Sequence, residues 1–227
     1  MVNAKRLDGM DLLLLHGAGS NVAVFEALIA QAAPGLVRRH ELMADLLARA
    51  EREGLSDALE EDLRDLLSTI ADSRPRLVLC TCSTLGGPVE RLGAEMSLAV
   101  ERVDRALAEA ALETGGPIVV LAATPATLQP TEVLFRSVAA DKGLNPTITL
   151  HLAKGAWPLF LSGDLPGYRE AVASAARDLA VGAEVIVLAQ VSMAPAKALL
   201  GDLPIDVLTS PELGMIRALG RLDARST

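Results

Sequence analysis

Short, wholly apolar runs alternate with helical segments along this chain, and this alternation constrains the fold more than any other feature. The runs contain Leu, Val, Ile and Ala, as in 12–15, 118–122 and 185–189. A strand without a polar face must be covered on both sides, which is typical of a parallel sheet flanked by helices. The sequence therefore predicts an α/β protein.

The individual elements follow from hydrophobic spacing, helix caps and proline positions. Strands are expected at 12–15, 76–80, 118–122, 147–152, 185–189 and 205–208. Helices are expected at 21–33, 40–53, 56–71, from 86–88 onward, at 95–113, 130–143 and 168–180, from 195, and at 210–222.

The two halves of the chain are similar in pattern. Each half contains two strands that run into a short polar loop, and these loops are 16–21, 81–84, 124–127 and 190–192. Ligands of open parallel sheets bind at the carboxyl ends of the strands. We therefore expect two similar lobes, each a parallel sheet flanked by helices, with the active-site cleft between them. Residues 1–97 plus 208–227 are expected to form the first lobe, and 98–207 the second.

Composition argues against several classes of partner. Apolar residues make up 51% of the chain, enough for a sizeable core, but aromatic residues make up only 2% and the net charge is −8. A nucleic-acid partner is therefore not expected, because it requires a basic face and stacking side chains. No apolar run is long enough to span a membrane or to form a signal peptide. We expect a cytoplasmic protein with no membrane partner, whose two cysteines are reduced.

Cys82 is the leading candidate for chemistry. It follows the strand expected at 76–80 and precedes Gly-Gly-Pro and a helix. A helix N-terminus nearby is expected to lower the pKa of a thiol. Ser83, Thr84 and the backbone N–H groups of the glycines could hold a substrate carboxylate. The alternative is that Cys82 is a small buried apolar residue, which is the favoured interpretation for Cys80.

Cys82-Ser83-Thr84 resembles the first cysteine motif of the cofactor-independent aspartate/glutamate/hydantoin racemase superfamily. Further segments match the pattern of this superfamily in the same order, and the resemblance spans nearly the whole chain. These segments are His16, Asn21, Phe25, Ala33-Pro34-Gly35 and His40, then Arg102-Val103-Asp104, 124–131 and 187–194.

The resemblance implies two α/β lobes and inversion at a carbon acid without cofactor or metal. One cysteine thiolate removes the α-proton, and a second thiol delivers a proton to the opposite face. Hydroxyl, amide and backbone N–H groups hold the carboxylate and stabilise the enolate-like state. Cys82 takes the first role. The implied substrate-binding residues are Asn21, Ser83, Thr84, Thr124, Thr127, Gln190, Val191 and Ser192.

The chain departs from the pattern at the second cysteine, where Gln190 stands. An amide cannot relay a proton, which argues against two-thiol racemisation. His16 is a candidate second acid, with a structural role as the alternative. The three histidines lack metal-ligand spacing, so no metal is expected.

We therefore expect a racemase or epimerase, independent of pyridoxal phosphate, that acts on a small carboxylate or hydantoin-like substrate. The alternatives are a single-cysteine decarboxylase or isomerase of a small carboxylic acid, and a non-catalytic protein that binds a small carboxylate. The apolar stretch 157–160 fits core packing, a subunit contact in a homo-oligomer or a substrate wall equally well.

Overall fold

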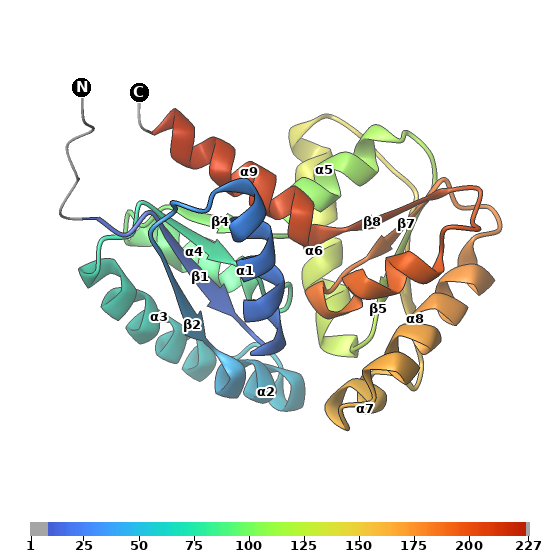
Figure 1. The fold of residues 1–227 in the computed structure, drawn as a ribbon, viewed down its shortest axis with the longest axis horizontal. Helices are drawn as coiled ribbons and strands as arrows, with labels where there is room; N and C mark the ends of the chain where they lie inside the picture. Colours follow the sequence, from blue (N-terminus) through green and yellow to red (C-terminus); the bar gives the residue numbers. More distant parts are fainter. Residues whose placement is uncertain (1–8, 226–227) are drawn as a thin grey trace.

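The protein forms two lobes side by side in the computed structural model, which describes residues 9–225 (Figure 1). The first lobe contains β1 (Leu12–His16), α1 (Ser20–Ala32), β2 (Arg38–Leu42), α2 (Ala44–Glu53), α3 (Asp57–Asp72), β3 (Leu77–Cys80), α4 (Gly86–Glu95) and β4 (Val100–Arg102). The second contains α5 (Arg105–Glu113), β5 (Ile118–Ala122), α6 (Pro125–Asp141), β6 (Ile148–Leu152), α7 (Ala156–Leu161), α8 (Leu165–Leu179), β7 (Val185–Leu188), the 3₁₀ helix η1 (Val191–Leu199) and β8 (Asp206–Thr209). The last helix is α9 (Ser210–Ala224).

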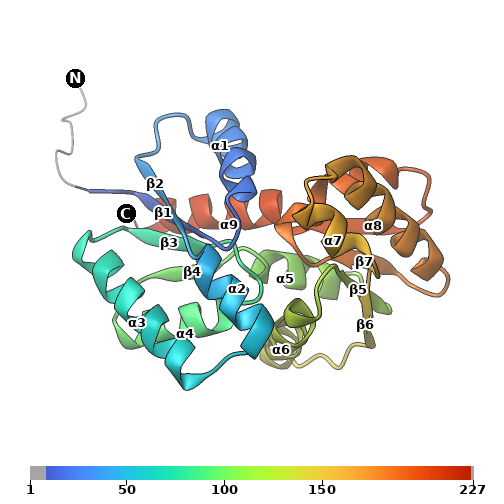
Figure 2. The same cartoon turned by 90° about the horizontal axis from the view of Figure 1, so that it is seen from below.

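Each lobe is built around a four-stranded parallel sheet. The strand orders are β2-β1-β3-β4 and β6-β5-β7-β8, so the second lobe repeats the order of the first. Helices lie on both faces of each sheet, as Figure 2 shows from below. The expected fold class, two similar α/β lobes, is confirmed.

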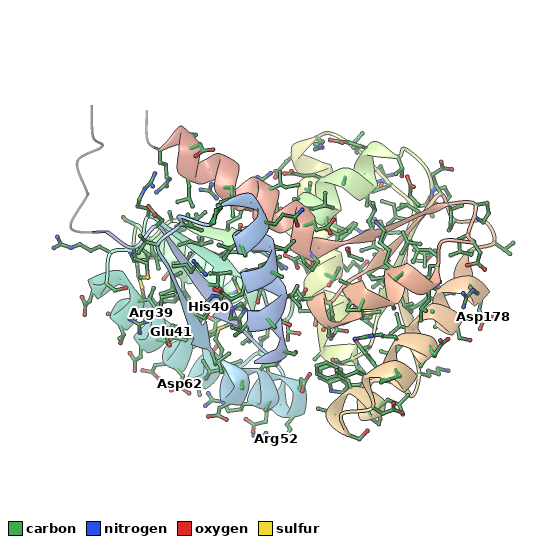
Figure 3. All side chains as sticks on the ribbon, viewed as in Figure 1. Arg39, His40, Glu41, Arg52, Asp62 and Asp178 are labelled. Carbon is green, nitrogen blue, oxygen red and sulfur yellow. The ribbon has the colours of Figure 1, made fainter. Side chains whose placement is uncertain are left out.

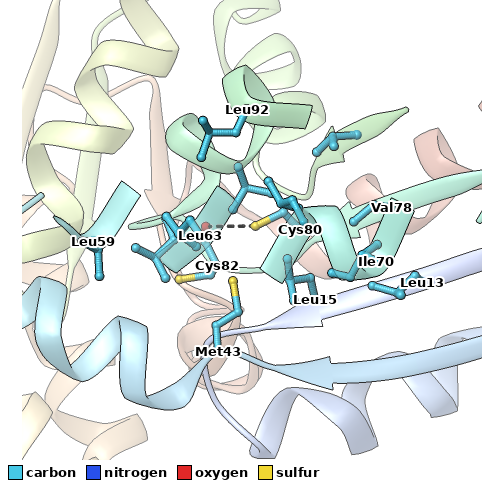
Figure 4. Close-up of a cluster of buried hydrophobic side chains, with 14 of the residues drawn as sticks. Leu13, Leu15, Met43, Leu59, Leu63, Ile70, Val78, Cys80, Cys82 and Leu92 are labelled. Atoms are coloured by element: carbon cyan, nitrogen blue, oxygen red, sulfur yellow. Dashed lines mark hydrogen bonds between the residues drawn. The ribbon is translucent and has the colours of Figure 1, made fainter. Parts of the chain in front are cut away.

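The wholly apolar strand β1 is buried because its alternate side chains enter two different cores. Leu13 and Leu15 pack with apolar residues of α3 and α4 on one face of the sheet (Figure 4). Leu12 and Leu14 pack with α1 and α9 on the other face. This arrangement explains why β1 lacks a polar side chain before His16, since neither face reaches water.

Helix α9 returns to the first lobe after the chain has completed the second. Its residues Met215, Ala218 and Leu222 pack into the same core as Leu12 and Leu14. Helix α9 thus packs against the first lobe, and Arg217 also joins it to Glu109 of α5. None of the helices within residues 9–225 has the length and apolar composition needed to cross a membrane.

Two strands of the first sheet lie where the sequence predicted helices. β2 (Arg38–Leu42) occupies the expected start of the helix at 40–53, and β4 (Val100–Arg102) interrupts the one expected at 95–113. β2 is a polar, half-buried edge strand, a type that apolar patterning does not detect. Elsewhere, α6 starts at Pro125 rather than at 130, and α7 had not been predicted.

Sheet membership also shifts both expected lobe boundaries. β4 pairs with β3, so residues 100–102 belong to the first sheet although they follow the boundary set at 97/98. β8 pairs with β7, so residues 208–209 belong to the second sheet although they follow the boundary set at 207/208.

A buried carboxylate on β4 connects the lobes through α9. Glu101 is 1% exposed and accepts hydrogen bonds from Arg217 Nε at 2.9 Å and Arg221 Nη1 at 2.5 Å. Arg217 also binds Glu109 on α5 at 2.6 Å, and Arg105 Nε lies 4.0 Å from Glu101. These arginines compensate a charge whose burial alone would be strongly unfavourable.

We expect the double substitution Arg217→Met and Arg221→Met to destabilise the protein more than Glu101→Gln. Loss of both guanidinium groups leaves Glu101 buried without its main partners, and uncompensated buried charges cost about 3–5 kcal/mol. After Glu101→Gln, the arginines can turn to solvent, since their side chains are already 33% and 39% exposed. Urea unfolding measures both free energies. An equal or reversed order would contradict the assignment.

Candidate active site

The candidate site is a pocket between the lobes at the carboxyl ends of the central strands. The space among its lining residues is partly open to solvent and measures about 420 Å³ with that solvent included. The loops that follow β1, β3 and β7 supply most of its wall, and α2, α6 and α7 complete it. Its lining residues are Gly17, Ala18, Asn21, Leu47, Glu51, Thr81, Cys82, Ser83, Thr84, Thr127, Trp157, Phe160, Gln190, Val191 and Ser192.

The pocket brings together most of the residues selected from the sequence. Cys82, Asn21, Ser83, Thr84, Thr127, Gln190, Val191 and Ser192 all line it. Thr124 does not: it precedes α6 as the N-cap residue and is 3% exposed. Its hydroxyl has no hydrogen-bond partner within the described chain. His16 also lies outside the pocket wall, behind Thr81.

The two cysteines differ in their access to the pocket. Both are free thiols that enter the same core (Figure 4). The thiol of Cys80 is 1% exposed and donates to the carbonyl oxygen of Cys82 at 3.7 Å. Only Cys82 of the two lines the pocket, because it lies beyond the end of β3. Cys82 therefore belongs both to the apolar core and to the pocket wall.

Gly17 allows the loop after β1 to approach the Cys82 sulfur. A Cβ atom at this position would lie 2.8 Å from Cys82 Sγ and 2.9 Å from Leu47 Cδ2. Both distances are far shorter than van der Waals contact. The loop after β1 therefore approaches both the thiol and Leu47 closely at Gly17. A larger residue at this position would require these two side chains to move.

The pKa of Cys82 differs from the sequence-based expectation. Burial raises it to about 11, and the nearby carboxylates of Asp104 and Glu51 act in the same direction. Backbone N–H groups of Leu85 and Thr84, at the start of α4, lower the pKa but do not offset burial. The expectation of a lowered pKa was wrong because desolvation outweighs the donors at the helix N-terminus.

Hydroxyl groups join the lobes at the edge of the pocket. Ser83 Oγ donates to the carbonyl oxygen of Ala189 at 2.8 Å, and Thr84 Oγ1 lies 3.1 Å from Thr127 Oγ1. Arg102, paired with Asp104 at 2.8 Å, lies 3.5 Å from the Ser83 carbonyl oxygen. Some of the hydroxyl groups that the sequence assigned to substrate binding therefore form hydrogen bonds between the two lobes.

Gln190 occupies in the second lobe the place that Cys82 occupies in the first. Cys80 pairs with Leu15, Leu188 pairs with Leu121, and each partner strand lies at the centre of its sheet. Cys82 and Gln190 each follow these paired residues by two positions. Gln190 Oε1 accepts from the Ala123 backbone N–H at 2.6 Å, so its amide N–H groups are directed elsewhere.

A chain of hydrogen bonds runs from the surface to the back of the pocket. Glu26 lies 2.7 Å from His40 Nε2, His40 Nδ1 lies 2.8 Å from His16 Nε2, and His16 Nδ1 lies 2.8 Å from Thr81 Oγ1. Figure 3 labels His40 at β2. Burial and the neighbouring His40 lower the pKa of His16 to about 4, so this imidazole is neutral near pH 7. His16 thus positions Thr81 and does not face a ligand directly.

The sequence left three interpretations open for the stretch 157–160, a substrate wall among them, and it gave no sign of Glu51. Trp157 and Phe160 of α7 stack with ring centroids 4.8 Å apart, which makes their stretch a pocket wall. Glu51 has the spacing of an ordinary helical residue and carries no local signal. Within residues 9–225, no group of three or more His, Cys, Asp and Glu residues is placed to hold a metal ion.

Comparisons with known proteins place this geometry in a structural context. No family model and no curated protein matches the sequence. Glutamate racemase from Bacillus anthracis superposes with a TM-score of 0.71 at 16% identity, covering 95% of this chain and 82% of the other. Aspartate racemase from Picrophilus torridus gives 0.65 at 15% identity, covering 95% of each chain.

An arylmalonate decarboxylase, in a glycine-to-cysteine variant associated with sulfate, is also similar. It superposes with a TM-score of 0.57 at 14% identity, covering 94% of this chain and 93% of the other. The similarity in all three cases extends over both lobes. The protein therefore has the two-lobe fold of the glutamate and aspartate racemases, as the resemblance in sequence implied.

Proposed function

We propose that this protein is a cofactor-independent racemase or epimerase, which uses the Cys82 thiolate to move a proton at the α-carbon of a small carboxylate. The observation that supports the proposal most strongly is the position of Cys82. Its thiol lies at the end of a central strand, in a pocket between lobes, among neutral hydrogen-bond donors. The racemase fold of the whole chain supports the same reaction class.

The pocket residues have different roles in proton abstraction. The amide N–H groups of Gln190 would hold the carboxylate, together with Thr84 and Ser192, whose hydroxyls also contact Thr127 and Tyr168. The thiolate takes the α-proton, and the electron pair left on carbon delocalises into the bound carboxylate. A thiol with a pKa of about 11 is a stronger base, once ionised, than an ordinary cysteine.

The lining of the pocket favours a substrate with one carboxylate and an apolar substituent. Among its lining residues, all within the described chain, none is Arg, Lys or His, and one is Glu. A second carboxylate would therefore lack a cation and face a like charge. The stacked rings of Trp157 and Phe160 offer an apolar surface to the rest of the molecule. Small α-substituted monocarboxylates and hydantoins are the substrates to examine first.

Gln190 supports a second candidate, which is chemistry with a single thiol. If the carbanion faces only an amide on the side of the second lobe, Cys82 can return the proton to the face it came from. The outcome would be exchange without inversion, or protonation after loss of carbon dioxide. Three measurements on the same substrate distinguish these reactions: optical rotation, carbon dioxide release and isotope exchange.

We expect the protein in heavy water to incorporate deuterium at the α-carbon of a carboxylate or hydantoin from a panel of such compounds. Cys82→Ala should reduce exchange by at least ~100-fold, because the base is lost. Cys80→Ala is the matched control and should retain exchange, since Cys80 does not reach the pocket. Mass spectrometry and proton NMR measure the label. Exchange that survives Cys82→Ala would refute the role of the thiol. If the protein exchanged the α-proton of none of these compounds, the remaining candidate function would be the binding of a small carboxylate.

Alkylation by iodoacetamide should modify Cys82 before Cys80 and should remain slow near pH 7. Only the thiolate reacts, and burial holds the pKa of Cys82 at about 11. The rate should therefore rise about tenfold for each pH unit between roughly pH 7 and 10. Peptide mapping by mass spectrometry measures both sites. A rate that levels off near pH 8, or earlier labelling of Cys80, would contradict the burial argument.

A further inference from the structure

Glu51 is an unexpected acidic group in the pocket wall. It lies near the end of α2, and its neighbours on this helix are paired away from the pocket. Arg49 binds Asp62 at 2.5 Å, and Arg52 lies 3.5 Å from Glu53. Arg52 and Asp62 lie on the outer surface of the lobe in Figure 3, whereas Glu51 lines the pocket.

The face of α2 that carries Glu51 lines the same pocket as Cys82. Leu47 lies one turn before Glu51, so both side chains share one face of the helix. The position of a Cβ at Gly17 would lie 2.9 Å from Leu47 Cδ2 and 2.8 Å from Cys82 Sγ. Leu47 and the Cys82 sulfur thus both border Gly17, and Glu51 continues the same face of α2 along the pocket.

Two acidic groups therefore line one pocket. Burial raises the pKa of Glu51, without an offsetting hydrogen bond or cation, and the charge of Glu51 raises the pKa of Cys82. Two like charges in one pocket disfavour each other, so the pair tends to hold one proton between them. One group is then a base while the other is an acid.

We propose that Glu51 is the second acid–base group of this site and carries out the proton transfer that the amide of Gln190 cannot. This inference rests on the proposed proton transfer by Cys82. The pKa of about 11 keeps the shared proton mainly on Cys82, and the form that reacts is the minor one, in which Cys82 is a thiolate and Glu51 a carboxylic acid. The thiolate forms an S–H bond as the substrate C–H bond breaks, and the electron pair stays on carbon. The Glu51 O–H bond then breaks as a new C–H bond forms, which leaves a thiol and a carboxylate.

The reaction balances without any other reagent. Cys82 and Glu51 together carry one proton before and after the reaction. It is on Glu51 before the reaction and on Cys82 after it. Transfer of this proton back from Cys82 to Glu51 restores the first form. The two groups approach the substrate from different elements, the strand-end loop after β3 and helix α2. A proton taken by one and supplied by the other is the condition for inversion.

The first experiment needs no substrate and tests the coupling between the two groups. Glu51→Gln removes the charge that opposes the thiolate, so alkylation of Cys82 near pH 8 should become several-fold faster. Glu53→Gln is the matched control, because Glu53 is on the same helix but outside the pocket and should leave the rate unchanged. An unchanged or slower rate in Glu51→Gln would overturn the proposal, whatever the natural substrate is.

The second experiment uses a substrate identified by deuterium exchange in the natural protein. Glu51→Gln should reduce inversion by at least ~100-fold and leave exchange within a few-fold, because Cys82 still removes and returns the proton. Glu51→Asp should restore part of the inversion, and Glu53→Gln should match the natural protein in both. Equal loss of exchange and inversion, or no loss of either, would overturn the proposal. Absence of exchange in the natural protein would instead refute the proposed function.

Discussion

The hydroxyl groups that join the lobes beside Cys82 are the interactions on which the rest of the site depends. Ser83 and Thr84 belong to the first lobe, and their partners, the Ala189 carbonyl and Thr127, belong to the second. Because these contacts lie at the carboxyl ends of both sheets, they bring the loops after β3, β5 and β7 around one small volume.

Whether a strand could be predicted from the sequence depends on how many polar residues it contains. β1, β5 and β7 are apolar on both faces, so their burial and the parallel sheets could be predicted. β4 could not be predicted, because Glu101 and Arg102 are buried charges that patterning assigns to solvent. Asp104, the partner of Arg102, lies two positions away in the sequence, but Arg217, the partner of Glu101, becomes its neighbour only when the chain has folded.

The candidate site was predictable where it follows strand ends and unpredictable where helices cover it. Cys82 and Gln190 carry a local signal, since polar residues follow apolar strands there. Glu51 carries none, because its helix places acidic residues on the outer surface as well as in the pocket. The sign of the pKa shift at Cys82 could not be predicted either, because it depends on how completely the surroundings exclude water.

The contact at Gly17 links the variation of two distant positions. A Cβ there would lie 2.8 Å from the sulfur and 2.9 Å from Leu47 Cδ2, so a larger residue at 17 requires both side chains to move. Loss of the cysteine would remove one of these two contacts and would make alanine or serine easier to accommodate in the loop after β1. Covariation of the two positions among related sequences would therefore trace which lineages retained the thiol, even where nothing is known of their substrates.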